Sequence, residues 1–309
     1  MVLVTGGAGF IGSAASSKLI ERGYPVVVYD NLSTGHRDAV APAARFVEGD
    51  TGDPACLEET FRRYPIRAVM HFAAAATVDA SVDACWRDNL AAPIMLLDAA
   101  RSAGVERFVF SSSAAVYGRG RSPLGETAPL DPITPYGLSK AVLEIMMELR
   151  RKPSRMACFS LRYFNVCGPG ERHSPETHLI PLVLETAAGK RKAVRIFGDD
   201  HDTPDGACVR DYLHVDDAAE ANIAALEADA DLAGSYNVGT GRGHSVKEVI
   251  GIAREVTGCE IPVEVAERRA GDPSALVADA GLIRDKLGWR ARRGLMSAIR
   301  SAWEGRQKP

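Results

Sequence analysis

The chain begins with an apolar run, Val2–Val4, that leads through Thr5 into three evenly spaced glycines, Gly6, Gly9 and Gly12. An amphipathic helical pattern follows at once, so this segment predicts a β-strand, a tight turn and an α-helix. The first N–H groups of such a helix attract anions, and glycines let a phosphate approach the backbone closely. We therefore expect a pyrophosphate-binding turn at the start of a parallel α/β sheet.

A second strand-like run, Val26–Tyr29, ends at Asp30, which lies 18 residues beyond Gly12. In dinucleotide-binding folds a carboxylate about 20 residues beyond the glycines binds the adenosine ribose hydroxyls. Its charge repels a 2′-phosphate, so we expect NAD rather than NADP. A glycine triplet alone also fits an ordinary turn, but the order strand, triplet, helix, strand and acid favours dinucleotide binding.

Strand-like and helix-like segments alternate through residues 1–165, which predicts a doubly wound parallel Rossmann-type sheet. Residues 166–309 contain more proline, glycine and charge with shorter helices, and we expect them to form a smaller α/β domain that binds substrate. The chain is expected to cross between the two domains. The predicted strands are Val2–Val4, Val26–Tyr29, Arg45–Val47, Ala68–Phe72, Arg107–Ser111 and Ala157–Tyr163.

Charge and cysteine content narrow the classes of function. The net charge of −3 argues against a general nucleic-acid-binding protein. None of the six cysteines forms a C-x-x-C pair or shows zinc spacing, so we expect no metal site and a reducing, cytoplasmic location. No apolar stretch reaches the roughly 20 residues of a membrane span, and the immediate first strand leaves no room for a signal peptide.

A serine and a Y-x-x-x-K pair predict catalysis. Ser113 ends a strand-like run, and Tyr136 and Lys140 lie one helical turn apart on one face. A nearby positive charge lowers the pKa of a phenol, and such a tyrosine acts as a general base near neutral pH. A solvated helix is the alternative interpretation. We expect Ser113 to bind the reacting hydroxyl, Tyr136 to take its proton, and Lys140 also to reach the nicotinamide ribose.

With these motifs in place, nearly the whole chain resembles the extended short-chain dehydrogenase/reductase family, and most closely its UDP-glucose (UDP-galactose) 4-epimerases. The resemblance implies NAD-dependent 4-epimerisation of a UDP-hexose through a transient 4-keto sugar, with Tyr136 as base. Related dehydratases need an acid pair after the catalytic serine, where this chain has Ala114 and Ala115. The runs that carry the resemblance are Thr5–Gly12, Ser111–Gly118, Pro135–Lys140, Leu161–Asn165, Glu176–Pro181, Asp202–Gly206, Val209–Val215 and Arg268–Asp272.

The resemblance also implies two sets of binding residues. Residues of the glycine turn and of the following strand ends should line NAD: Gly6, Gly7, Gly9, Phe10, Ile11, Gly12, Asp30, Asn31, Asp50, Thr51, Phe72, Ala73, Ala74, Asn89, Ser111, Tyr136, Lys140 and Tyr163. Residues mostly from the second half should hold the UDP-sugar: Ser113, Asn165, His178, Leu179, Phe197, Arg210, Arg269, Asp272 and Leu276.

The chemistry of these residue types supports part of the implied UDP-sugar site. Arginine forks suit a pyrophosphate with about two negative charges. Arg210 would otherwise be a surface ion pair with Asp211, and His178 alone would more often be structural.

Three positions depart from the family pattern. Ala76 stands where some members have a lysine near the nicotinamide, which weakens the expected retention of NAD. Pro93 should kink the helix predicted for Asn89–Ala103 or mark its first turn. Leu276 occupies the position that limits space for a 2-acetamido group, and leucine is intermediate between the large and small residues found there.

Alternatives stay open for substrate and class. The enzyme alternatives are 4-epimerases of UDP-N-acetylglucosamine or UDP-glucuronate. A non-enzymatic NAD-binding sensor is the other class, although it would not need Ser113, Tyr136 and Lys140. Helices Asn89–Ala103 and Tyr136–Arg150 are apolar on more than one face, so a homodimer with a four-helix contact is expected.

Overall fold

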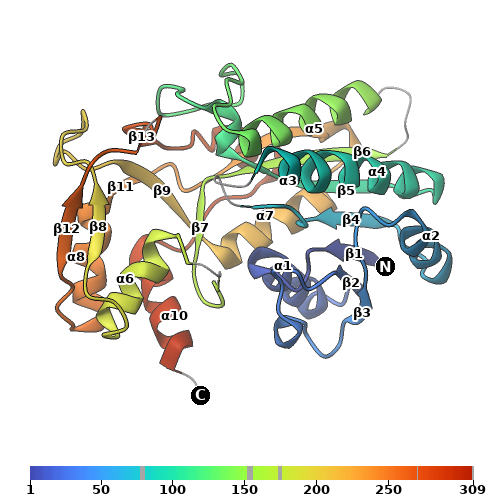
Figure 1. Cartoon of the computed structure of the whole chain (residues 1–309). Coiled ribbons are helices and arrows are strands. Elements are labelled where there is room, and N and C mark those ends of the chain that lie inside the picture. Colours follow the sequence, from blue (N-terminus) through green and yellow to red (C-terminus); the bar gives the residue numbers. More distant parts are fainter. Residues whose placement is uncertain (77–80, 152–155, 173–175, 270, 308–309) are drawn as a thin grey trace.

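A seven-stranded sheet forms the centre of the computed structural model, which describes residues 1–76, 81–151, 156–172, 176–269 and 271–307. The strand order is β10-β6-β5-β4-β1-β2-β3, and every neighbouring pair is parallel (Figure 1). The strands are β1 (Val2–Thr5), β2 (Val26–Asp30), β3 (Arg45–Glu48), β4 (Ala68–His71), β5 (Arg107–Ser113), β6 (Ala157–Tyr163) and β10 (Gly234–Val238).

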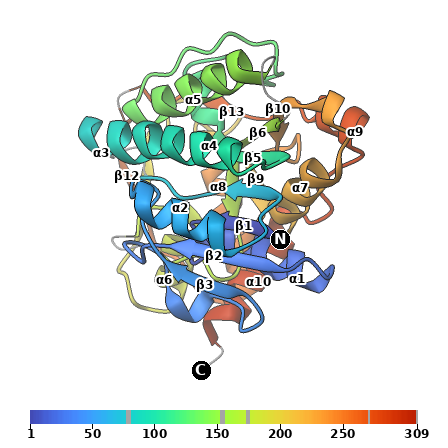
Figure 2. The ribbon, with the colours of Figure 1, turned by 90° about the vertical axis from the view of Figure 1, so that its right-hand side faces the viewer.

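Helices cover both faces of this sheet, so the predicted doubly wound α/β fold is confirmed (Figures 1 and 2). On one face, α1 (Phe10–Glu21), α7 (Val215–Glu227) and α9 (Gly281–Leu287) bury apolar side chains against the strands. On the other face, α2 (Pro54–Arg63), α4 (Ala92–Ser102) and α5 (Pro135–Arg151) do the same. The near-continuous apolar strands reflect burial on both sides.

The helix expected over Asn89–Ala103 differs from the prediction in its first part. Helix α3 (Val82–Trp86) continues into a π-helical turn, η2 (Arg87–Ala91), before α4 begins at Ala92. Pro93 lies in the first turn of α4, directly after the π-helical turn, and it has no N–H to donate to a carbonyl of that turn. The 3₁₀ helices are η1 (Arg37–Ala39), η3 (Ala114–Tyr117) and η4 (Ala230–Leu232).

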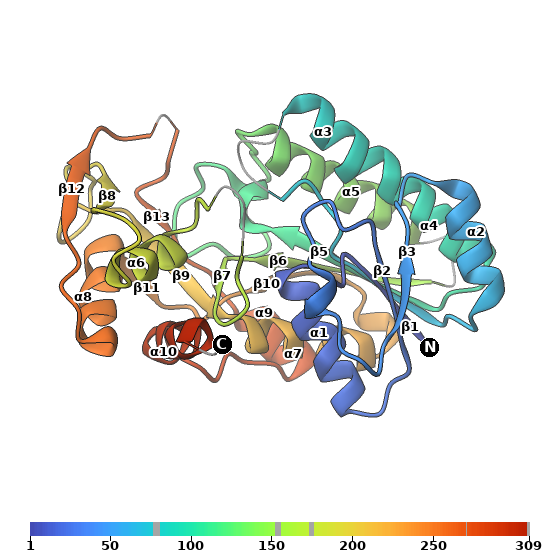
Figure 3. The same cartoon turned by 60° about the horizontal axis from the view of Figure 1, so that its bottom comes forward.

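A second, smaller core lies beyond the carboxyl ends of the large sheet's strands (Figure 3). It is built on two small sheets with strands β7 (Asn165–Cys167), β8 (Val194–Phe197), β9 (Val209–His214), β11 (Gly243–Ser245), β12 (Val263–Ala266) and β13 (Ala275–Leu276). Three helices pack on them, α6 (Leu179–Ala187), α8 (Val246–Thr257) and α10 (Leu295–Gln307).

The chain returns to the large sheet after residue 165. Strand β10 pairs in parallel with β6 at one edge, and α7 and α9 pack on the same core as α1. The division into domains at residues 1–165 and 166–309 therefore remains a proposal. Strand β10 and helices α7 and α9 belong to the second segment in sequence but pack with the large sheet. Within the described ranges, no helix is both long and apolar enough to cross a lipid bilayer.

Candidate active site

The glycine turn has the shape of an anion-binding site. Gly6 adopts φ +69°, and a Cβ on Gly12 would lie 2.2 Å from the Gly6 carbonyl oxygen. Helix α1 starts after Gly9, which supplies no side-chain cap to its first N–H groups. These N–H groups are the partners that a pyrophosphate would take at a helix amino terminus. The residues present thus fit the phosphate part of a dinucleotide.

Asp30 lies at the carboxyl end of β2, beside the glycine turn. Its Oδ2 accepts the N–H of Ala8 at 3.0 Å and its Oδ1 accepts the N–H of Leu32 at 2.8 Å. Each oxygen of an ionised carboxylate has a further lone pair for a ribose hydroxyl. Asp30 thus ties the glycine turn to the loop after β2 and keeps capacity to bind a ribose.

The loop after β4 closes the other side of the turn. The N–H of Phe72 donates to the carbonyl oxygen of Thr5 at 2.9 Å, and a Cβ on Gly6 would lie 2.5 Å from the Ala73 nitrogen. Asn89 bonds both backbone groups of Ala75, at 2.7 and 3.0 Å. Asn89 therefore supports the loop that carries Phe72, Ala73 and Ala74.

The remaining predicted cofactor residues lie at strand ends or at the start of α1. Asn31 donates to Asp50 at 2.7 Å, which joins the loops after β2 and β3. The phenol of Tyr163, at the end of β6, accepts the amide of Asn222 at 2.6 Å. Phe10 and Ile11 are the first residues of α1, Thr51 is buried, and a Cβ on Gly7 would meet the Val28 side chain at 2.9 Å.

Strand β5 and helix α5 bring the three predicted catalytic residues together. The Lys140 Nζ donates to the Ser111 carbonyl oxygen at 2.8 Å and lies 5.7 Å from the centroid of the Tyr136 ring. Ser113 lies near enough to the Tyr136 phenol to lower its pKa. The helix start can approach the strand end because a Cβ on Gly137 would lie 2.5 Å from the Ala115 carbonyl oxygen.

The electrostatics of this group differ from the prediction. Burial raises the pKa of the Tyr136 phenol, and Ser113 acts in the opposite direction. Burial lowers the pKa of Lys140 to about 7, against the charge of Glu144, which raises it. In the protein by itself, burial therefore leaves the pKa of the Tyr136 phenol raised, and an effect of Lys140 on that pKa stays a prediction.

Two arginines from the smaller core lie where the substrate's pyrophosphate is expected. Arg210, on β9, pairs with Asp272, and its side chain is only 11% exposed. It does not pair with its neighbour Asp211, which is buried and accepts the N–H groups of residues 240 and 241. The Arg269 guanidinium lies 4.0 Å from the centroid of the Phe197 ring, a cation–π contact. Ala270, between these groups in the sequence, lies outside the described residues.

His178 begins the helix expected to contact the nucleotide. It is the N-cap of α6, Leu179 opens that helix, and Asn165 begins β7. The His178 Nδ1 lies 3.5 Å from Glu176 and 3.6 Å from Glu171. A hydrogen bond with Glu176 raises the pKa of His178 against the effect of burial. The two neighbouring carboxylates thus favour the protonated form of the imidazole.

Leu276 lies between the two halves of the site. It pairs with Arg210 through β13 and packs on a cluster that includes Ala114 and Val116, directly after Ser113. This position is compatible with a contact to the sugar ring. It links the arginine region to the catalytic strand end.

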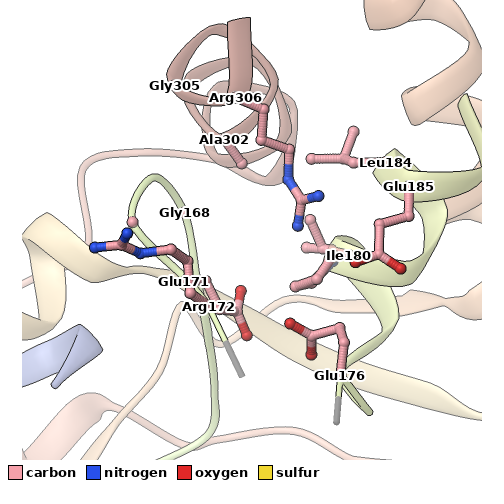
Figure 4. Close-up of a pocket in the computed structure, with 12 residues that line it drawn as sticks. Gly168, Glu171, Arg172, Glu176, Ile180, Leu184, Glu185, Ala302, Gly305 and Arg306 are labelled. Atoms are coloured by element: carbon pink, nitrogen blue, oxygen red, sulfur yellow. The ribbon is translucent and has the colours of Figure 1, made fainter. Parts of the chain in front are cut away.

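A separate cavity of about 450 Å³ lies between the loop before α6, α6 itself and the end of α10 (Figure 4). Glu171, Glu176 and Arg306 lie on its wall. Because Glu176 also accepts the N–H of His178 at 2.9 Å, the cavity borders the predicted substrate loop. The residues that line it include none of the predicted catalytic side chains.

The sequence interpretation missed two residues that organise the site. Glu144 lies four residues after Lys140, so the same spacing rule that paired Tyr136 with Lys140 would have found it. His201 lies within hydrogen-bond reach of the Phe197 carbonyl oxygen through Nε2, at 3.2 Å, and of Ser274 through Nδ1, at 3.4 Å. No sequence spacing indicates that link.

Known proteins resemble this chain over most of its length. The model of the NAD dependent epimerase/dehydratase family matches residues 2–239. A UDP-glucose 4-epimerase from Corynebacterium glutamicum is 44% identical over 98% of this chain and 94% of that protein. The crystal structure of a UDP-glucose 4-epimerase from Brucella ovis in complex with NAD has a TM-score of 0.93 at 45% identity, covering 98% of this chain and 97% of that chain. The UDP-Glc/GlcNAc 4-epimerase from Campylobacter jejuni has a TM-score of 0.85 at 38% identity, covering 98% of both chains.

Proposed function

Since the chain belongs to the NAD dependent epimerase/dehydratase family, we propose that it uses NAD to interconvert UDP-glucose and UDP-galactose. One observation carries the proposal. Ser113, Tyr136 and Lys140 meet at the carboxyl ends of the parallel strands, at the same edge as the glycine turn. Ligands of open parallel sheets bind at that edge.

Bound NAD supplies the redox step, in which C4 of the hexose is oxidised and then reduced again on the opposite face. Tyr136 takes the proton of the 4-hydroxyl and later returns it. Ser113 hydrogen-bonds that hydroxyl and orients it toward the phenol. Lys140, fixed on the Ser111 carbonyl oxygen, presents positive charge that favours the phenolate when the base forms.

The 4-keto sugar must present both faces, so the substrate has to turn while its nucleotide stays bound. Arg210 and Arg269 anchor the pyrophosphate, and His178, Leu179, Phe197 and Asn165 hold the remainder of the nucleotide. Arginine forks match phosphate oxygens, which allows a firm anchor about which the sugar pivots. Ala114 and Ala115 follow Ser113 where an eliminating enzyme needs acids, so water stays on the sugar.

We also propose a homodimer. Helices α3, α4 and α5 expose large apolar side chains on the side away from the sheet: Val82, Trp86, Met95, Leu138, Ile145 and Leu149. Leu149 is 74% exposed and Ile145 is 52% exposed. A two-fold contact of these helices with a second copy would cover them. The six cysteines are all free thiols, which supports the proposed cytoplasmic location.

The test is direct. Purified protein is incubated with UDP-galactose, and the UDP-sugars are separated and quantified over time, with heat-denatured protein as control. We expect UDP-galactose to be converted to UDP-glucose. Incubations that start from either sugar should reach the same equilibrium ratio of the two. Parallel incubations with UDP-N-acetylglucosamine and UDP-glucuronate separate the alternative substrates. If UDP-galactose stays unchanged with NAD supplied, the proposed function is wrong.

A further inference from the structure

Three successive turns of helix α5 face three successive residues of strand β5. Lys140 donates to the Ser111 carbonyl oxygen at 2.8 Å, the hydroxyl of Ser112 donates to Glu144, and Ser113 lies near enough to the Tyr136 phenol to lower its pKa. Residues 136, 140 and 144 are spaced by four and share one face of the helix. The contact between Ser112 and Glu144 lies behind the catalytic pair and plays no part in the proposed chemistry.

Glu144 is a buried carboxylate with a full set of partners. Its side chain is 3% exposed, and it pairs with Arg162 of β6, whose side chain is 6% exposed. Arg162 Nη2 donates to Oε2 at 2.6 Å and Arg162 Nε donates to both oxygens, at 3.1 and 3.0 Å. Ser235 of β10 adds a contact at 3.3 Å. Glu144 thus joins α5 to β5, β6 and β10.

Arg162, the positive member of this pair, also donates hydrogen bonds to groups other than Glu144. Arg162 Nη1 donates to the Tyr117 phenol at 2.8 Å and to the Glu126 carbonyl oxygen at 3.4 Å. Glu144, in contrast, lies one helical turn from Lys140. The pair is therefore a fixed dipole whose negative end is the nearer one to the lysine.

Lys140 is buried, so the groups packed around its ammonium decide how far its charge is stabilised. Its ammonium group lies 4.8 Å from the centroid of the Phe110 ring, and burial lowers its pKa to about 7. The titratable groups that face it are Tyr136, Glu144, Cys85 of α3 and His71 of β4. Glu144 is the stronger of the two that raise the pKa of Lys140, and Cys85 is the other.

We propose that Glu144 is a positioning residue for the reaction: it fixes α5 in register on β5 and supplies the buried negative charge that stabilises the ammonium group of Lys140. The inference rests on the proposed function, in which Lys140 assists the Tyr136 base. Glu144 does not touch substrate. It acts through the lysine.

The experiment compares three variants of the full-length protein supplied with NAD. Glu144→Gln removes the charge and keeps the shape. Glu148→Gln is the matched control, because Glu148 is exposed one turn further along the same helix. The double variant Glu144→Gln/Arg162→Met removes both charges together, which avoids the uncompensated buried arginine that makes such single changes costly.

The first measurement follows the protonation of Lys140 without using activity. Lysine side chains are labelled with ¹³C at Cε, the Lys140 signal is assigned by its loss in Lys140→Met, and its shift is titrated with pH. Glu144→Gln should move the titration down by about one pH unit, the effect of one close opposite charge. The double variant should fall between Glu144→Gln and the wild type, and Glu148→Gln should match the wild type.

The second measurement is the pH profile of turnover. In Glu144→Gln, kcat should decline at lower pH than in the wild type, with a loss of up to about tenfold near pH 8, while KM for UDP-galactose changes little. If Glu144→Gln does not fold, the Lys140 titration of the double variant is compared with that of the wild type. The inference then requires the double variant to titrate at the lower pH. An unchanged Lys140 titration overturns the inference even if the protein is an epimerase. A shifted titration in a protein that lacks epimerase activity keeps the electrostatic role and overturns the proposed function instead.

Discussion

The Nζ of Lys140 donates a hydrogen bond to the carbonyl oxygen of Ser111 at 2.8 Å, which fixes the lysine beneath the ring of Tyr136. Because the lysine is held by backbone, replacing the phenol leaves this attachment intact. Tyr136→Phe should therefore keep the fold and NAD binding but lose about 10²–10⁴-fold in kcat, the usual size of a general-base contribution. Turnover of UDP-galactose with circular dichroism as a folding control checks this. Near-normal turnover would mean that another group takes the proton.

The retention of cofactor provides a second prediction. A cofactor that is regenerated in each cycle has no need to leave, so purified protein should release NAD or NADH on denaturation. If Asp30 binds the adenosine ribose as proposed, its carboxylate would repel a 2′-phosphate, so NADP should support little activity. Chromatography of the released nucleotide measures the occupancy, which the alanine at position 76 should keep below one per chain. Equal activity with NADP and NAD would contradict the role given to Asp30.

Leu276 provides a test of specificity. It packs against the cluster that includes Ala114, the residue after Ser113, so we expect Leu276→Tyr to remove space beside the C2 substituent of the sugar. Overpacking costs about 1–3 kcal/mol, which is roughly ten- to hundredfold in kcat/KM. We expect that loss for UDP-N-acetylglucosamine and little change for UDP-glucose, measured side by side. An equal loss for both sugars would show that Leu276 does not limit this space.

The apolar face of α5 predicts the assembly. Ile145→Glu combined with Leu149→Glu should convert a dimer into a monomer, because two carboxylates would be buried at the contact. Light scattering at micromolar concentration measures the mass. Val265→Glu is the matched control. Val265 is 58% exposed and lies on β12, in the two-stranded sheet, whereas α5 packs on the seven-stranded sheet. A monomeric wild-type protein would refute the proposed dimer.

His71 predicts how stability depends on pH. It is buried at the end of β4, and burial with the nearby Lys140 charge lowers its pKa from 6.5 to about 3. The unfolded chain therefore binds a proton that the folded protein refuses, and stability falls as pH drops below about 6.5 toward 3. The slope from this one group is about 1.4 kcal/mol per pH unit.

His71→Gln should flatten the acid limb of the free energy of unfolding, measured by urea denaturation between pH 4 and 7. His36→Gln, at an exposed histidine, is the control and should leave the slope unchanged. The same slope in His71→Gln and wild type would show that His71 titrates normally in the folded protein.

Local patterns in the sequence predicted the elements that depend on local chemistry. Each of these patterns depends only on residues that are close in sequence: the glycine turn, the strand that ends at Asp30, and the Tyr136–Lys140 spacing. Strand β10 was not predicted, because Gly234–Val238 has no alternation or length that separates it from a loop, and only pairing with β6 defines it. The partner of Arg210 was also not predictable, since Asp272 is 62 residues away in sequence.

The position of β10 has a consequence for synthesis of the chain. During translation the first six strands leave the ribosome long before residue 238, so the edge of β6 has no neighbour for more than 70 residues of growth. An open edge in an otherwise complete parallel sheet invites pairing with other nascent chains. The side chains that β10 brings, Ser235 and Asn237, complete hydrogen bonds with Glu144 and Tyr117. A ribosome-bound fragment that ends before β10 should therefore be a chaperone client, whereas one that includes it should resist proteases.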